Sequence, residues 1–80
     1  MLDTKGRLVV CFRAVFPELS EAEAAVASVS TLAAWDSVAT VTLAAAVEEE
    51  FGLQMEPEEI EKMNSFASIF NFVVERSPTR

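Results

Sequence analysis

The chain has 80 residues, with one cysteine, no histidine and a formal net charge of −7. A domain of this length buries only about 60% of the surface that its unfolded chain exposes, so it has little room for an enclosed active site. Without histidine the chain lacks the commonest general base and the commonest metal ligand, and one cysteine excludes an internal disulfide. We therefore expect a small protein with no histidine triad and no metal site.

The negative charge is concentrated in the middle of the chain. Residues 17–61 include eleven acidic residues and no basic one, whereas residues 1–16 and 62–80 each carry a net charge of +2. A field of one sign repels nucleic acid and anionic membranes and attracts basic protein surfaces. We therefore expect basic protein partners, and neither nucleic acid nor membrane, although acidic residues also simply keep small proteins soluble.

No segment is expected to place the chain in a membrane. The longest strongly apolar run, around residues 8–16, is interrupted by Arg13 and is too short to span a bilayer. The first residues do not have the layout of a signal peptide. We therefore expect a cytoplasmic protein.

The first predicted helix ends at Pro17, and a long connection follows it over residues 17–35. The apolar residues of the helix have the i, i+3, i+4, i+7, i+8 spacing of a segment with one buried face. A connection this long is unusual unless it is functional or contains a short turn of its own. Cys11 lies on the apolar face, where we expect it to pack as a small apolar group. The apolar residues are Leu8, Cys11, Phe12, Val15 and Phe16.

A second helix is predicted from about Ser37 to Phe51. Asp36 or Ser37 is suited to cap its start, and Gly52 is suited to close it in a left-handed conformation. Its ends are therefore well specified by the sequence.

Two further helices complete the prediction. Pro57 suits the first position of a short third helix, Glu58 and Glu59 complement its positive end, and Lys62 its negative end. The last helix begins near residues 64–65. It places Phe66, Ile69, Phe70 and Val73 on one face. We expect one all-α domain over residues 1–76, with three longer helices and a short third one, and a flexible tail at residues 77–80.

The predicted second helix has two apolar sectors when its residues are placed at about 100° each on a helical wheel. The predicted core sector is Ala39, Leu43, Ala46, Val47 and Phe51. Opposite lies a second apolar strip, made of Val38, Val41 and Ala45, with Glu48 and Glu49 near it one turn further on. Apolar surface rimmed by charge is a common form of docking site. Either a partner or the connection 17–35 is expected to cover the second apolar strip.

Ser37 lies at the head of this helix, where backbone N–H groups point outward and the helix dipole is positive. A phosphate on its hydroxyl would be stabilised there. An Asp-Ser pair before a helix also serves as a plain N-cap, so the pair alone does not distinguish the two roles.

The longer stretch "DSVATVTLAAAVEEEFG" resembles the phosphopantetheine-attachment region of acyl carrier proteins. In that family an Asp-Ser-Leu triplet opens the second helix, and an acidic run followed by Phe-Gly closes it. Asp36, Ser37 and Val38 occupy the positions of the triplet. Residues 48–52 correspond to the acidic run and the Phe-Gly pair, with no gap in between. The preceding "STLAAW" is similar to the end of the family's first loop, and "MEPEEIEKMNSFASIFNFV" to its third and last helices. The resemblance covers residues 30–74 well.

This resemblance implies a monomeric four-helix bundle of the acyl-carrier type that is not itself an enzyme. A phosphopantetheinyl transferase, which holds magnesium, would move the 4′-phosphopantetheine arm from coenzyme A to Ser37. The arm's thiol would carry acyl or related cargo as a thioester between enzymes of lipid or secondary metabolite biosynthesis. Asp36 would help present Ser37. The docking surface for partners with basic patches would consist of Asp36, Val38, Val41, Ala45, Glu48 and Glu49.

Three positions depart from the carriers of housekeeping fatty acid synthesis. Ala39 and Thr42 occupy places where those carriers usually have acids, and Trp35 before the Asp-Ser pair is more typical of specialised carriers. The resemblance therefore indicates a specialised member. The aromatic set Phe66, Phe70 and Phe72, facing the small residues 44–46, would either shape a cargo cavity or form plain core.

Three alternatives to a carrier are an interaction domain, an acid–base enzyme and a calcium-binding protein. An unmodified helical interaction domain would dock through the second apolar strip and leave Ser37 untouched. Carboxylate pairs within residues 48–50 or 56–61 lack a pocket that would separate their pKa values for acid–base catalysis. The segment "EPEEIE" lacks the alternating acids and central glycine of a calcium loop.

Overall fold

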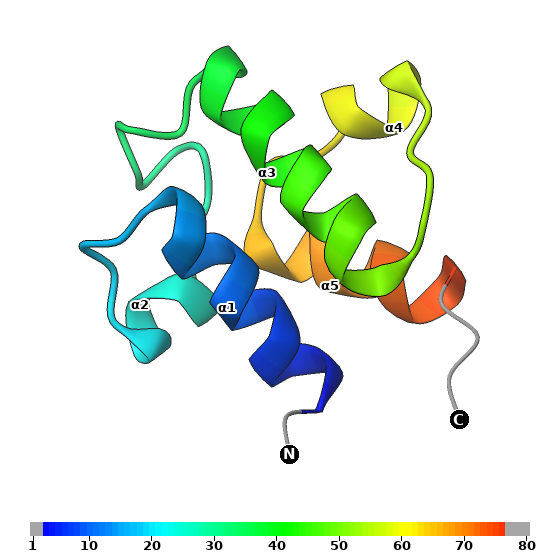
Figure 1. The fold of residues 1–80 in the computed structure, drawn as a ribbon. Helices are drawn as coiled ribbons and strands as arrows, with labels where there is room; N and C mark the ends of the chain where they lie inside the picture. Colours follow the sequence, from blue (N-terminus) through cyan, green and yellow to red (C-terminus); the bar gives the residue numbers. More distant parts are fainter. Residues whose placement is uncertain (1–2, 77–80) are drawn as a thin grey trace.

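A computed structural model describes residues 3–76 of the chain. These residues form five helices: α1 (Thr4–Val15), α2 (Glu21–Ala25), α3 (Ser37–Phe51), α4 (Pro57–Glu61) and α5 (Phe66–Arg76). In Figure 1, α1 lies between α2 and α3, and α4 lies on the far side of α3. The described residues form no β-strand, only one isolated bridge between Ser28 and Ser65. The predicted all-α class is confirmed, and the tail predicted at residues 77–80 lies outside the described residues.

The connection predicted over residues 17–35 contains a helix of its own, so there are five helices where four were predicted. Ser20 and Glu23 form a capping box at the start of α2. The Glu23 N–H donates to Ser20 Oγ at 3.1 Å, and the Ser20 N–H donates to Glu23 Oε1 at 2.8 Å. This reciprocal pair stabilises a helix of only five residues, which packs against α1 and α5.

The helix ends follow the local chemistry of the sequence. Asp3 caps α1 by accepting a hydrogen bond from the Gly6 N–H at 2.8 Å, so α1 begins before its first apolar residue. Gly52 closes α3 with φ of 67° and donates its N–H to the Glu48 carbonyl. Pro57 begins α4. The predicted ends of α3 and the predicted start of α4 are therefore confirmed.

An aromatic cluster forms the centre of the core. Phe12 of α1 is fully buried, and its ring centroid lies 5.1 Å from that of Phe66 and 5.4 Å from that of Trp35. Leu43 and Val47 of α3 are also fully buried. Helices α1, α3 and α5 are thus joined around one apolar centre.

Arg7 connects the beginning of α1 to the end of α3. Its Nε lies 2.8 Å from Glu50 Oε2, and its Nη2 donates to the Glu50 carbonyl at 2.6 Å. Its guanidinium also lies 4.5 Å from the centre of the Phe51 ring. Because the far end of α1 contacts Trp35, just before α3, the two helices run antiparallel.

Candidate functional site

Ser37 is the first residue of α3, and it is exposed. The cap of this helix is Asp36, whose Oδ1 accepts a hydrogen bond from the Ala39 N–H at 2.9 Å. Of the two residues that the sequence offered as the cap, the structure uses Asp36. The Ser37 hydroxyl is therefore not needed to begin the helix.

The residue before the cap anchors the site to α1. Trp35 is 4% exposed, and its ring centroid lies 5.4 Å from that of Phe12 and 6.0 Å from that of Phe16. Its indole Nε1–H donates to Thr40 Oγ1 at 2.9 Å, and Thr40 Oγ1 donates to the Asp36 carbonyl at 3.0 Å. We call this pair of hydrogen bonds the Trp35–Thr40 clamp. Sequence reasoning singled out Trp35 but missed Thr40, because the indole contact depends on how the loop turns into α3.

The second apolar strip lies on the surface. Val38 is 73% exposed and Val41 is 62% exposed, and Ala45 is exposed as well. Of the two alternatives that the sequence left open for covering this strip, residues 17–35 do not cover it, because α2 packs against α1 and α5 instead. The side chains of Val38, Val41 and Ala45 therefore form an apolar surface directly beside Ser37.

The opposite face of α3 is the predicted core face with one addition. Leu43, Val47 and Phe51 are buried, and Ala39 and Ala46 are partly buried against the core. Ala44 is also buried, although the wheel did not include it in the core sector.

The three glutamates at the end of α3 have different surroundings. Glu48 is half-buried, and its Oε2 accepts a hydrogen bond from the Met55 N–H at 2.8 Å. Glu49 is exposed, and Glu50 forms the ion pair with Arg7. Of the two glutamates predicted to dock partners, Glu48 thus already holds the segment that follows α3.

The surface around Ser37 carries little charge. Ala39 is partly buried, and Thr42 is exposed with its Oγ1 donating to the Val38 carbonyl at 3.0 Å. Asp36 is the acidic residue next to Ser37, and its carboxylate accepts the capping hydrogen bond. A partner that docks here would meet mainly apolar and hydroxyl groups.

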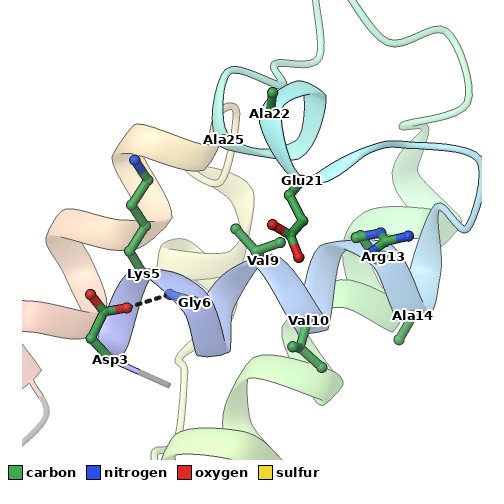
Figure 2. A pocket seen from close by; sticks show the side chains of 10 residues that line it. All are labelled: Asp3, Lys5, Gly6, Val9, Val10, Arg13, Ala14, Glu21, Ala22 and Ala25. Atoms are coloured by element: carbon green, nitrogen blue, oxygen red, sulfur yellow. Dashed lines mark hydrogen bonds between the residues drawn. The ribbon is translucent and has the colours of Figure 1, made fainter. Parts of the chain in front are cut away.

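A hollow with a volume of 710 Å³ lies between α1 and α2. Figure 2 shows Val9 pointing toward α2, and Glu21 reaching from α2 toward α1 beside Arg13. The second hollow, of 440 Å³, is lined by residues of α4, α5 and the segments before them. Ser37 lines neither of these two hollows.

The aromatic residues of α5 have different surroundings. Phe66 is buried against Phe12, and its ring is stacked with that of Phe70 at 6.3 Å between centroids. Phe72 lines the second hollow, where the Arg76 guanidinium lies 4.6 Å from its ring centre. Of the two roles that the sequence left open, Phe66 therefore has the core role.

Two further observations concern metal binding and the single cysteine. Within residues 3–76 no group of three or more cysteine, aspartate or glutamate side chains is arranged to hold a metal ion. Cys11 is buried, as predicted, and burial together with the negative charge of Glu50 raises the pKa of its thiol to about 11. The thiol is therefore protonated and unreactive at neutral pH.

Within the same described range, no helix combines the length and the apolar character that crossing a membrane requires. In the comparisons with known proteins, no family model, no curated protein and no solved structure matches the chain.

Proposed function

We propose that the protein is an acyl carrier protein that receives a 4′-phosphopantetheine arm on Ser37. The observation that carries this proposal is the exposed Ser37 at the first position of a 15-residue helix whose cap is supplied by Asp36. The hydroxyl is accessible and is not required by the fold. The resemblance of residues 36–52 to the attachment region of carriers supports the same assignment.

In the proposed reaction, Ser37 Oγ attacks the phosphorus that bears the pantetheine in coenzyme A. An Oγ–P bond forms, and the P–O bond to adenosine 3′,5′-bisphosphate breaks. The hydroxyl proton passes to a base of the transferase, which also holds the magnesium. On the carrier, the first-turn N–H groups and the dipole of α3 favour a phosphate at Ser37. When bound, the arm supplies a thiol that carries the acyl group as a thioester.

The second apolar strip is proposed as the surface that partner enzymes contact. Val38 and Val41 are exposed beside Ser37, so a partner that covers them comes within reach of the hydroxyl. Asp36, which caps α3, and Glu49, in the last turn of α3, add exposed acidic groups, and a basic rim on the partner would complement them. Because Ala39 and Thr42 are uncharged, apolar contact contributes more beside Ser37 than charge does. This favours partners of a specialised pathway.

The exposed strip also supports a second candidate, an unmodified interaction domain. Such a domain would use Val38, Val41 and Ala45 in the same way, but Ser37 would remain a free hydroxyl. The two candidates therefore differ at one atom, Ser37 Oγ, and a measurement of covalent mass separates them.

The test is intact-mass analysis after incubation with coenzyme A, magnesium and a broad-specificity phosphopantetheinyl transferase. Wild type should gain the mass of one phosphopantetheine group, and Ser37→Ala should gain none. Ser30→Ala is the matched control, because Ser30 is another exposed serine outside the site, and it should be modified like wild type. If wild type gains no mass, the carrier proposal is wrong and the interaction domain is favoured. Equal modification of Ser37→Ala would overturn the assigned site.

A further inference from the structure

The backbone on both sides of Ser37 is fixed by side chains that sequence patterns alone do not connect. Before Ser37, the Trp35 ring is buried against Phe12 and Phe16 of α1. After it, Thr40 receives the indole N–H at 2.9 Å. The exposed hydroxyl thus lies between two anchored residues.

Asp36, which precedes Ser37, is held at both its carboxylate and its carbonyl. The Ala39 N–H donates to Oδ1 at 2.9 Å, and the carbonyl accepts from the Thr40 N–H at 2.9 Å and from Thr40 Oγ1 at 3.0 Å. The Thr40 hydroxyl donates to Asp36 and accepts from Trp35, so both of its functions are used. A buried indole N–H without a partner is costly, which favours this single arrangement.

We propose that Trp35 and Thr40 are positioning residues for the modification of Ser37. This inference rests on the carrier function proposed above. The clamp joins the first turn of α3 to Trp35, whose ring packs against α1, and thereby fixes the direction in which the Ser37 side chain leaves the helix. Trp35 and Thr40 act on Ser37 through Asp36 and the backbone. A nucleophile that is already held in the reactive orientation reacts faster than a nucleophile that is free to adopt many orientations.

Four variants isolate the clamp. Trp35→Phe keeps an aromatic ring in the core and removes the indole donor. Thr40→Val keeps the shape and removes the hydroxyl, whereas Thr40→Ser keeps the hydroxyl. Thr42→Val is the matched control for the rate at saturating transferase, because Thr42 Oγ1 makes the same kind of bond to a helix carbonyl, at 3.0 Å to Val38, without a tryptophan partner. Thr42 lies on the surface that a partner contacts, so the half-saturating transferase concentration is compared only between wild type and the variants of Trp35 and Thr40.

The measurement is single-turnover modification with excess transferase, coenzyme A and magnesium, followed by intact mass. The rate at saturating transferase should fall roughly five- to tenfold in Trp35→Phe and in Thr40→Val, and no further in the double variant. The half-saturating transferase concentration should stay within about twofold of wild type, because the second apolar strip is unchanged. Thr40→Ser and Thr42→Val should keep the wild-type rate. Circular dichroism in urea identifies conditions in which every variant is folded.

A second readout follows the clamp in the unmodified protein. Hydrogen exchange of the Trp35 indole N–H should be slow in wild type and in Thr40→Ser, and faster in Thr40→Val. Equal exchange in wild type and Thr40→Val would show that the hydrogen bond does not form, and would overturn the inference.

The outcomes of the rate measurement separate this inference from the proposed function. If wild type is modified and both Trp35→Phe and Thr40→Val keep its saturating rate, the clamp does not position Ser37, and the carrier function stands. An equal loss in Thr42→Val would assign the effect to general weakening of α3 and would also overturn the inference. If wild type is not modified at all, the carrier function and the positioning role are both wrong.

Discussion

Replacing Glu48 by alanine is expected to destabilise the fold, whereas the same replacement at Glu49 is not. The two residues are neighbours in the last turn of α3 and have the same helix propensity, so alanine changes that property equally. They differ in their contacts. Glu48 Oε2 accepts the Met55 N–H at 2.8 Å, whereas Glu49 is exposed.

The magnitude follows from the hydrogen bond that is lost. A bond from a backbone N–H to a carboxylate contributes about 1.5–3 kcal/mol, and water can partly replace it at this half-buried position. Negative charge at the end of a helix is unfavourable by about 0.3–1 kcal/mol, and both variants remove one such charge. We therefore expect Glu48→Ala to lower the free energy of unfolding by about 1–2 kcal/mol, or roughly 5–15 °C in Tm for a domain of this size. Glu49→Ala should be neutral or slightly stabilising.

Urea unfolding followed by circular dichroism measures this difference directly. The midpoint should fall in Glu48→Ala, with an unchanged dependence of the free energy on urea concentration. Glu48→Gln keeps an acceptor oxygen and should lie between wild type and Glu48→Ala. If Glu48→Ala and Glu49→Ala have the same stability within about 0.3 kcal/mol, the hydrogen bond to Met55 does not hold the segment after α3, and Glu48 returns to the docking surface as a free acid.

Three further predictions concern separate parts of the molecule. Gly52→Ala should lower the free energy of unfolding by about 1–2 kcal/mol, because φ is 67° while the added Cβ meets no atom within 4 Å; Gly52→Asn should cost less, and an equal loss in both would contradict the conformational explanation. Val41→Ser should raise the half-saturating transferase concentration roughly fivefold without changing stability, since this side chain is 62% exposed; unchanged binding would remove it from the docking surface. Burial raises the pKa of the Cys11 thiol from 9.0 to about 11, so the folded state keeps its proton to higher pH than the unfolded state. Stability from this group is complete below pH 9 and is lost as the pH rises toward 11; Cys11→Ala should lack this slope in urea titrations across that range.

The parts of the fold that were predictable depend on chemistry close along the chain. Asp36 and Gly52 mark the ends of α3, and Pro57 marks the start of α4, because caps and fixed dihedral angles act within a few residues. The same kind of local signal, Ser20 with Glu23, was present for α2. Because α2 has only five residues, the apolar periodicity that predicts the longer helices does not indicate it.

The features that were not predictable depend on contacts between distant segments. The wheel separated two apolar sectors of α3, but only the packing of α2 on α1 and α5 decided that Val38 and Val41 stay exposed. Glu48 and Glu50 belong to the same run of glutamates. Glu48 accepts a hydrogen bond from the Met55 N–H, whereas Glu50 forms an ion pair with Arg7, which is 43 residues away along the chain. Such partners are set by the tertiary arrangement, and periodicity carries no information about them.

Trp35 also gives the protein an optical signal at the proposed site. The chain has one tryptophan and no tyrosine, so its near-ultraviolet fluorescence arises almost entirely from the indole two residues before Ser37. That indole is buried between α1 and the start of α3 and is hydrogen-bonded to Thr40. Its emission wavelength and quenching therefore report on this junction alone, without a label. Binding at the second apolar strip, or a modification of Ser37, can therefore be followed in the unlabelled protein as a change in the emission wavelength and fluorescence lifetime of Trp35.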